Sequence, residues 1–313
     1  MSDPAQIRRV GFVGLGNMGG PMVARLLGDG FEVVAYDTAP AAIERAVEGG
    51  AVGANALEDA ARGTDAIVLM LPNSAIVTAV VEQLRSAGAL AEGLVVIDMS
   101  SSEPQRTREL AAELAQSGVA LVDAPVSGGV RGAVGGKLTI MVGADDEQLA
   151  RVRPVLESLG TVRHAGAVGA GHAIKALNNL LSASHLLATA EAMAAGTRFG
   201  LDPDVMLAVF NGSSGKSGST ENKYPNFIRT GRYDSGFGLR LMLKDMRIAT
   251  SLAEQEGVPA RLGVEAVELW SEAAESLEPT ADHTEIARWI DQLVPPSDGI
   301  TAPPPPGTGP MTS

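Results

Sequence analysis

Short apolar runs alternate with amphipathic stretches through the first half of the chain. Several runs are apolar at every position, which is typical of strands that helices cover on both faces. The runs lie at 9–13, 32–36, 66–71, 94–98, 120–123 and 138–142. Helical patterns fall between them at 18–27, 40–48, 74–86 and 103–116, and a last helix and strand follow at 147–159 and 161–164. The alternation predicts an α/β fold with a doubly wound parallel sheet over residues 1–165.

The pattern changes after Gly171. Residues 172–199 contain no proline and one glycine, and their leucines recur at helical spacing. This predicts a helix on the order of 40 Å long, which exceeds a crossover helix and is expected to link two domains. Further helical patterns at 203–210, 239–256, 260–275 and 284–293 predict an all-α domain over residues 166–295. We expect a functional loop at 211–238 and a disordered proline-rich tail at 296–313.

Composition limits the partners. The 313 residues include 24 Lys and Arg against 37 Asp and Glu, and a net charge of −13 repels nucleic-acid backbones. There is no cysteine, and the four histidines show no ligand spacing, so no metal is expected. No apolar run approaches the roughly 18 residues of a membrane span, and the first residues do not resemble a secretory signal. We therefore expect a cytoplasmic protein without a membrane or nucleic-acid partner.

Three glycines separate the first predicted strand from the first predicted helix, in the pattern G-x-G-x-x-G. The first glycine permits a tight turn, the second lets the backbone approach a pyrophosphate, and the third lets helix and strand pack closely. The start of the helix adds unpaired N–H groups for phosphates. This indicates a Rossmann-type dinucleotide site with contacts from Gly14, Gly16, Asn17, Met18 and Gly19. The alternative is a glycine-rich turn that binds nothing.

Asp37 ends the second predicted strand. A carboxylate at that position accepts the ribose hydroxyls of NAD and repels the 2′-phosphate of NADP. Thr38 follows it, where an arginine would have favoured NADP. The sequence therefore favours NAD, with NADP possible. The alternative is an acidic residue that merely ends a strand.

A second glycine motif follows the strand at 120–123. Ligands of open α/β sheets bind at such carboxyl ends. Ser127, Gly128 and Gly129 offer a hydroxyl and unobstructed backbone N–H groups, which suit a carboxylate. The alternative is a flexible loop.

Lys175 and Asn179 lie four residues apart, and hence on one face of the long helix. Lys175 begins an apolar helix and has no acidic neighbour three or four residues away. Partial burial is expected to lower its pKa, so that the amine can exchange a proton near neutral pH. The alternative is a solvated lysine.

These stretches together resemble the β-hydroxyacid dehydrogenase family, over about residues 8–293. The motif D-A-P-V-S-G-G, the pair Lys-x-x-x-Asn and the segment Leu243-Lys244-Asp245 all match the family. The resemblance implies a Rossmann domain, a long linking helix and an all-helical domain, with the active site between them. It also implies association as a homodimer or homotetramer.

The resemblance further implies a role for each matched residue. Lys175 would be the catalytic acid/base, and a small carboxylate substrate would be held by Ser127, Gly128, Gly129 and Asn179. The nicotinamide and its ribose would lie near Leu71, Pro72, Ser101 and Lys244. The implied reaction is hydride transfer between a nicotinamide cofactor and the β-hydroxyl of a small hydroxy acid.

Arg240 departs from the family pattern, since many relatives carry an uncharged residue there. It could pair with a second anionic group of the substrate, or be an exposed arginine at a helix start. Three other functions remain open. They are a semialdehyde reductase that uses NADPH on tartronate or succinic semialdehyde, an imine reductase, and a non-catalytic dinucleotide-binding protein. The Lys175–Asn179 pair speaks against the last two, and Asp37 speaks against NADPH.

Overall fold

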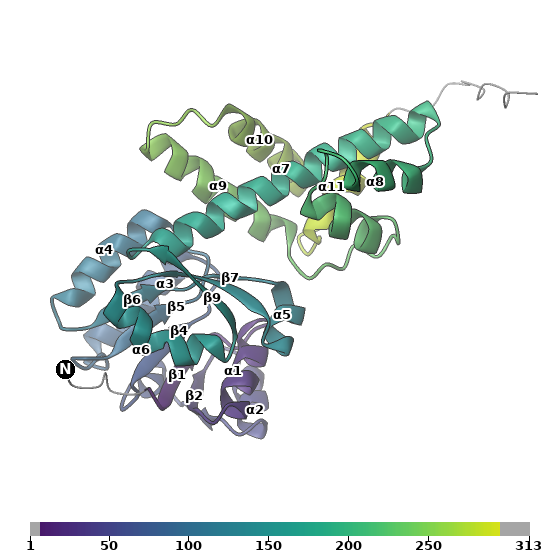
Figure 1. The fold of residues 1–313 in the computed structure, drawn as a ribbon. Coiled ribbons are helices and arrows are strands. Elements are labelled where there is room, and N and C mark those ends of the chain that lie inside the picture. The colour runs from purple at the N-terminus through teal and green to yellow at the C-terminus, as the bar shows by residue number, and fades with distance from the viewer. Residues whose placement is uncertain (1–6, 295–313) are drawn as a thin grey trace, which may run out of the picture. The chain divides into compact units, whose positions relative to one another are not determined.

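The computed structural model describes residues 7–294, which form two compact units (Figure 1). Unit 1 contains the described residues up to Leu181 together with Met242–Val264. Unit 2 contains Ser182–Leu241 and the described residues from Glu265 on. The tail predicted at 296–313 lies outside the described residues. The predicted fold class, a Rossmann-type α/β sheet followed by helices, is confirmed.

Unit 1 is built on a nine-stranded sheet in the order β3-β2-β1-β4-β5-β6-β8-β7, with β9 beside β8. The strands are β1 (Arg9–Val13), β2 (Glu32–Tyr36), β3 (Val52–Gly53), β4 (Ala66–Leu69), β5 (Val95–Asp98), β6 (Ala120–Asp123), β7 (Val126–Ser127), β8 (Leu138–Gly143) and β9 (Gly160–Gly166). All pairs from β3 to β6 are parallel, whereas β8 is antiparallel to β6 and β7. The predicted parallel sheet is therefore confirmed from β3 to β6 and for the pair β8–β9, and is wrong where β8 pairs with β6 and β7. Between β6 and β8 the chain has the two-residue β7, which pairs antiparallel with β8, and the seven-residue α5.

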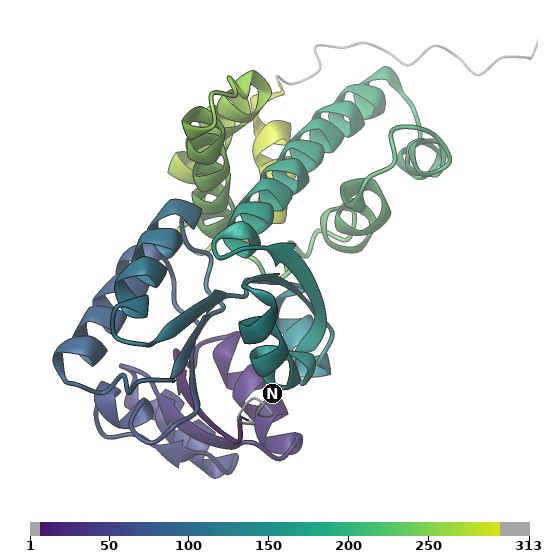
Figure 2. The ribbon, with the colours of Figure 1, turned by 60° about the vertical axis from the view of Figure 1, so that its left-hand side comes forward.

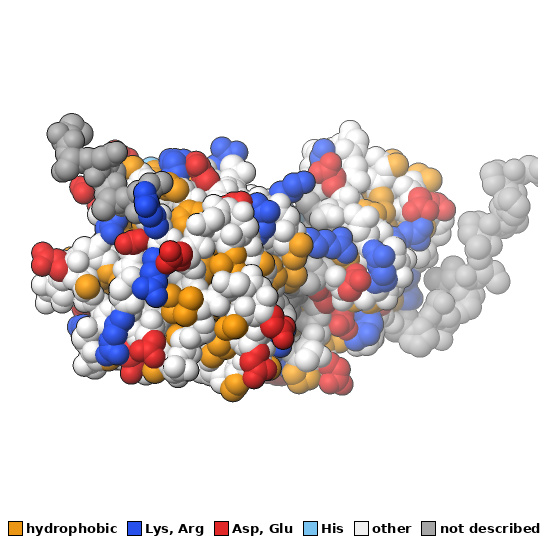
Figure 3. Space-filling view, turned by 90° about the horizontal axis from the view of Figure 1, so that it is seen from below, with side chains coloured by type: hydrophobic (Ala, Val, Ile, Leu, Met, Phe, Trp, Pro, Cys, Tyr) orange, Lys and Arg blue, Asp and Glu red, His pale blue; other side chains and the backbone are white. Residues whose placement is uncertain are grey.

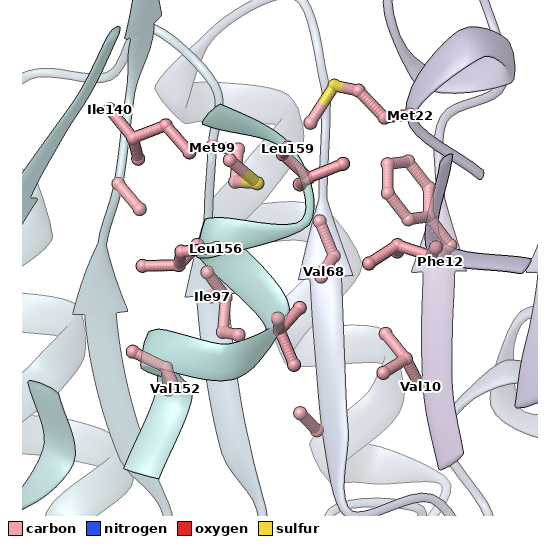
Figure 4. Close-up of a cluster of buried hydrophobic side chains, with 14 of the residues drawn as sticks. Val10, Phe12, Met22, Val68, Ile97, Met99, Ile140, Val152, Leu156 and Leu159 are labelled. Atoms are coloured by element: carbon pink, nitrogen blue, oxygen red, sulfur yellow. The ribbon is translucent and has the colours of Figure 1, made fainter. Parts of the chain in front are cut away.

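Helices cover both faces of this sheet (Figure 2). They are α1 (Gly19–Gly28), α2 (Pro40–Glu48), α3 (Ser74–Ser86), α4 (Pro104–Ala115), α5 (Gly129–Gly135) and α6 (Asp146–Glu157), with a 3₁₀ turn at Leu57–Ala60. Both faces of the sheet are buried at β4, because Val68 packs in one buried cluster and its neighbours Ile67 and Leu69 pack in another. Figure 4 shows the first cluster, with Leu156 of α6 over the strands. Apolar side chains on both faces explain why these strands do not alternate in sequence.

Helix α7 (Ala170–Phe199) runs unbroken for 30 residues, as predicted for 172–199. Its first part, through Leu181, belongs to unit 1, as does most of α9 (Leu239–Gln255). Within unit 1 the two helices meet in a small apolar cluster of Ala176, Ile248 and Ala249. This contact brings the Lys175 turn and the Lys244 turn into one packed unit.

Unit 2 is helical, as predicted. Besides the rest of α7 it contains α8 (Pro203–Asn211), η2 (Ser219–Ile228), most of α10 (Arg261–Ser276), η3 (His283–Glu285) and α11 (Ile286–Leu293). The functional loop predicted at 211–238 is partly wrong, because η2 is a helix with π-type hydrogen bonds. Its Gly-, Ser- and Asn-rich surroundings have low helix propensity, yet Phe227 and Ile228 are buried and hold the helix in place.

The surface carries mixed charge. On the face in Figure 3, basic and acidic side chains are interspersed, without the continuous basic patch that is typical of nucleic-acid binding. Within residues 7–294, no group of three or more His, Cys, Asp or Glu side chains could hold a metal ion. In the same part of the chain, no helix is both long and apolar enough to cross a bilayer.

A partly buried polar cluster in unit 2 surrounds Asp282. Its carboxylate accepts hydrogen bonds from the Ser235 hydroxyl at 2.8 Å and from the Gly236 backbone N–H at 2.8 Å. His283 beside it is 1 % exposed, and its Nδ1 lies 3.0 Å from the backbone oxygen of Phe237. Burial, and then the charge of Lys223, lower the pKa of His283 to about 4. The imidazole is therefore neutral in the folded protein at neutral pH.

We expect the free energy of unfolding to fall as the pH drops from 6.5 to about 4. In this window the unfolded chain binds a proton at His283 that the folded protein does not bind. The free energy of unfolding should therefore fall by on the order of 1–3 kcal/mol. Urea unfolding of the wild type and of His283→Gln at several pH values measures the effect. The variant should lose part of the pH dependence, and the exposed-histidine control His185→Gln should keep all of it. Equal slopes for His283→Gln and wild type would contradict the assignment.

Candidate active site

The glycine turn after β1 shows which of its glycines the fold itself requires. Gly14 has φ +97°, and a Cβ there would lie 2.3 Å from the Met70 backbone oxygen. A Cβ on Gly19 would lie 1.8 Å from the Gly14 oxygen, so close packing of α1 on β1 demands glycine. A Cβ on Gly16 would meet nothing within 4 Å. The missing side chain at Gly16 therefore leaves open space beside the turn, as the close approach of a dinucleotide needs.

Asp37, just beyond β2, is tied to this turn. Its Oδ2 accepts a hydrogen bond from the Leu15 backbone N–H at 2.7 Å, and its Oδ1 accepts one from the Ala39 N–H at 2.8 Å. The carboxylate thus fixes the turn after β1, a role that the sequence analysis missed. Each carboxylate oxygen has a second lone pair, so both can still accept a ribose hydroxyl.

We expect Asp37→Asn to raise the ratio of kcat/KM with NADP to kcat/KM with NAD by about tenfold, equivalent to about 1.4 kcal/mol. The amide removes the charge that repels a 2′-phosphate but keeps an oxygen for the Leu15 N–H. Initial rates with both cofactors give the ratio, and Glu48→Gln, on the exposed end of α2, is the charge-matched control. A ratio unchanged from wild type would show that Asp37 only supports the turn.

Three of the four residues predicted to lie near the nicotinamide follow β4 and β5, whose carboxyl ends are adjacent, and the fourth lies on α9. The Leu71 backbone N–H donates to the Ser100 hydroxyl at 2.9 Å. The Ser101 carbonyl accepts a hydrogen bond from Lys244 Nζ at 2.6 Å. These two contacts bring Leu71, Ser101 and Lys244 to one edge of unit 1, and Pro72 follows Leu71 directly. Their contact with a cofactor stays a prediction.

Ser127, Gly128 and Gly129 do not form the flexible loop considered as an alternative. Ser127 ends β7 and pairs with Thr139 of β8, and Gly129 begins α5. Gly128 and Gly129 have φ of +127° and +60°, conformations that residues with side chains rarely adopt. The motif is an ordered link between strand and helix, which keeps its backbone groups in a defined place.

Lys175 and Asn179 lie on the first turns of α7 and are 7 % and 5 % exposed. The Asn179 side-chain amide donates to Asp245 Oδ2 at 2.6 Å, and Lys244 Nζ lies 3.1 Å from Asp245 Oδ1. Burial lowers the pKa of Lys175, the charge of Asp245 opposes this, and the charge of Lys244 adds to it. The direction is the one that the sequence predicted.

Asp245 is the partner that the sequence analysis did not identify. It is 1 % exposed and is reached by residues from both α7 and α9. The family match of the Leu243-Lys244-Asp245 segment pointed to this region. The spacing of residues along one helix, however, cannot reveal a contact between Asp245 and Asn179, which lie 66 residues apart. A continuous chain of contacts thus runs from Ser101 through Lys244 and Asp245 to Asn179.

Arg240 lies in unit 2 and has a different set of contacts. Its Nη1 donates to the Glu278 carbonyl at 2.9 Å and its Nη2 donates to the Ala274 carbonyl at 2.6 Å. These oxygens belong to the end of α10 and the turn after it, where a cation is favourable. The contacts support a structural role, and a substrate contact by Arg240 stays a prediction.

Three features together define a dinucleotide-dependent oxidoreductase. They are a largely parallel sheet, a glycine turn with open space at Gly16 and a buried lysine at the start of a long helix. The family models agree with this class. Residues 9–169 match the NAD binding domain of 6-phosphogluconate dehydrogenase, and residues 169–290 match the domain described as NAD-binding of NADP-dependent 3-hydroxyisobutyrate dehydrogenase. The chain belongs to the β-hydroxyacid dehydrogenase family, as its motifs predicted.

Individual relatives cover most of the chain. It is 39 % identical over 272 residues to 3-hydroxyisobutyrate dehydrogenase of Pseudomonas aeruginosa, covering 84 % of this chain and 91 % of the relative. It is 38 % identical over 264 residues to 2-(hydroxymethyl)glutarate dehydrogenase of Eubacterium barkeri, covering 84 % and 88 %. The solved structure of Mycobacterium tuberculosis 3-hydroxyisobutyrate dehydrogenase with L-serine matches with a TM-score of 0.86 and 31 % identity, covering 91 % and 99 %. The protein is thus an NAD(P)-dependent β-hydroxyacid dehydrogenase that is similar to the 3-hydroxyisobutyrate enzymes.

Proposed function

We propose that the protein oxidises the β-hydroxyl of a small hydroxy acid such as 3-hydroxyisobutyrate, with Lys175 as general acid/base and NAD as the preferred cofactor. The observation that carries this proposal is the buried amine of Lys175 beside the Asn179–Asp245 contact, with its pKa lowered by burial. Relatives named for 3-hydroxyisobutyrate and 2-(hydroxymethyl)glutarate support the substrate class, since both substrates carry a carboxylate and a β-hydroxyl.

In the proposed reaction, the Ser127 hydroxyl and the backbone N–H groups of Gly128 and Gly129 hold the substrate carboxylate. The neutral amine of Lys175 removes the hydroxyl proton, and Asn179, held by Asp245, orients that hydroxyl. A nicotinamide, when bound, supplies the acceptor for the hydride that leaves the same carbon. The open space beside Gly16 and the Asp37 carboxylate fit the pyrophosphate and ribose of such a cofactor. Lys175 returns its proton when the reaction runs towards reduction.

We also propose a domain division at residue 165, with a cofactor-binding first domain and a substrate and oligomerisation domain over 166–295. The two family models, which meet at residue 169, support this division. Homodimer or homotetramer formation is supported by exposed apolar side chains on α7, among them Ile174, Leu177 and Leu181. Analytical ultracentrifugation tests the assembly. The cytoplasmic location stays a prediction.

A substrate screen tests the proposed function. We expect NADH formation at alkaline pH with 3-hydroxyisobutyrate or a closely related hydroxy acid, and a lower kcat/KM with NADP. Faster turnover of tartronate or succinic semialdehyde with NADPH than of any hydroxy acid with NAD would favour the reductase alternative. Tight NAD binding without turnover in either direction would leave only a dinucleotide-binding protein.

A further inference from the structure

Two buried carboxylates stand side by side at the carboxyl edge of the sheet. Asp98 ends β5 and Asp123 ends β6, and the two residues are register partners in the parallel pair. They are 1 % and 0 % exposed, and neither has a place in the reaction proposed above. Burial of two charged groups is costly unless both are well hydrogen-bonded, so the partners of these carboxylates indicate what they do.

Asp123 fixes the start of α7. Its Oδ1 accepts the Gly169 backbone N–H at 2.7 Å and its Oδ2 accepts the His172 backbone N–H at 2.8 Å. These N–H groups belong to the first turn, where the helix offers them no acceptor and where a negative charge is favourable. Room for the carboxylate depends on two glycines. A Cβ on Gly143 would lie 2.3 Å from Asp123 Oδ1, and one on Gly171 would lie 2.9 Å from Asp123 Oδ2.

Asp98 fixes the loop that follows β5. Its Oδ1 accepts the Ser100 backbone N–H at 3.0 Å, and its Oδ2 accepts the Ser102 hydroxyl at 2.8 Å. This loop contains Ser101, whose carbonyl accepts the hydrogen bond from Lys244. One carboxylate therefore holds the loop predicted to face the nicotinamide, and its neighbour holds the helix that carries Lys175.

The His172 side chain joins these two parts. The ring is 1 % exposed, with Nε2 at 3.1 Å from the Ser100 carbonyl oxygen and 3.7 Å from Asp98 Oδ2. Only acceptors face Nε2 among these contacts, so this nitrogen carries a hydrogen and donates it to Ser100. Nδ1 lies 2.8 Å from the Thr107 hydroxyl of α4, which also contacts the Glu103 carbonyl at 3.0 Å. The ring is held on both sides and has one orientation.

We propose that His172 is a positioning residue, which sets the distance between the Lys175 amine and the Ser100–Ser101 backbone by bonding the first turn of α7 to that loop. His172 precedes Lys175 by three residues, so a shift of this turn moves the amine directly. The inference rests on the proposed role of Lys175. Misplacement of a reacting group by about 1 Å can cost on the order of 10²-fold in rate, so a contact that never touches substrate can still govern kcat.

The test compares three variants of the full chain with 3-hydroxyisobutyrate deuterated at its hydroxymethyl carbon. His172→Phe keeps a ring but removes both hydrogen bonds. His172→Gln keeps an amide N–H that can reach the Ser100 oxygen. The matched control Thr64→Val removes a buried hydroxyl of unit 1 that bonds only the Ala61 carbonyl, at 2.7 Å and away from the site. For each variant kcat, KM, the deuterium isotope effect on kcat, the Kd of NAD and Tm are measured.

For His172→Phe we expect kcat to fall by about tenfold to a hundredfold, with the Kd of NAD within about twofold of wild type. The isotope effect should rise as hydride transfer becomes rate-limiting, and His172→Gln should restore most of kcat. Thr64→Val should lower Tm without changing the isotope effect. A His172→Phe enzyme with lowered Tm but wild-type kcat and isotope effect would overturn the inference, because a purely structural role predicts that pattern.

Two further variants keep the outcome decisive. Should His172→Phe fail to fold, His172→Leu takes its place, because it is smaller and also lacks a donor for the Ser100 oxygen. A wild-type kcat and isotope effect in His172→Leu would overturn the inference. Lys175→Ala is assayed in parallel. If it retains activity, the proposed function itself fails. If it is inactive while the His172 variants behave as wild type, only the positioning role fails.

Discussion

Replacing Lys175 by alanine is expected to lower kcat for hydroxy acid oxidation by about 10²- to 10⁴-fold, the usual contribution of a general base. The amine is the buried basic group beside Asn179, and alanine leaves nothing there to accept the hydroxyl proton. Initial rates of NADH formation measure the effect, and calorimetry should show that the Kd of NAD is nearly unchanged. The exposed lysine in Lys137→Ala serves as control and should retain wild-type kcat. Near-full kcat in Lys175→Ala would remove this residue from the mechanism.

The pH dependence of the same enzyme gives an independent check. Burial lowers the pKa of Lys175 from the ordinary 10.5, so the neutral, proton-accepting amine is populated at a lower pH than for an exposed lysine. Oxidation should therefore accelerate with rising pH and reach its plateau below 10.5, while reduction declines over the same range. Between the lowered pKa and 10.5 the unfolded chain binds more protons than the folded one, so stability rises with pH there. Lys175→Met should lose this rise.

Two alanine substitutions in the glycine turn should have opposite consequences. Gly19→Ala places a Cβ 1.8 Å from the Gly14 oxygen, a backbone atom that cannot move without distorting the turn. We expect a loss of about 3 kcal/mol in the free energy of unfolding, the upper range for overpacking. Gly16→Ala places its Cβ in open space and should leave stability unchanged. Because that space is where a dinucleotide would approach, the Kd of NAD should rise by at least about tenfold, or about 1.4 kcal/mol.

Chemical denaturation and NAD titration of both variants separate the two effects. If Gly16→Ala binds NAD as tightly as wild type, the cofactor does not use the space beside the turn. If Gly19→Ala is as stable as wild type, the backbone contact at 1.8 Å must relax without cost, contrary to the packing seen here.

The periodicity of the sequence was sufficient to predict the longer helices and strands. The ranges 9–13, 32–36 and 120–123 coincide with β1, β2 and β6, since buried strands read as uninterrupted apolar runs. The strand predicted at 66–71 ends at Leu69, where the chain turns into the loop that carries Leu71. The strand β7 was missed because two residues are too few to show a period, and α5 was missed because its glycines interrupt the apolar pattern of a helix. The direction of β8 follows from chain connectivity, which periodicity does not contain.

The candidate site was predictable to the extent that its residues lie close together in sequence. Lys175 and Asn179 could be paired because they share a helix face, and the burial of Lys175 followed from its apolar surroundings. Asp245 and the contacts of Arg240 could not be predicted, because their partners lie 66 and more than 30 residues away. The Asp98, Asp123 and His172 contacts join three separate elements, and no local pattern reports such a network.

The dihedral angles of Gly128 and Gly129 have a consequence for the proposed contact with the substrate carboxylate. Both residues already occupy left-handed conformations, with Ser127 on one side paired to β8 and α5 beginning on the other. A segment that is ordered beforehand loses little conformational entropy when an anion arrives. The affinity for the carboxylate should therefore depend little on loop motion. Selectivity among hydroxy acids should come from the residues that contact the rest of the substrate.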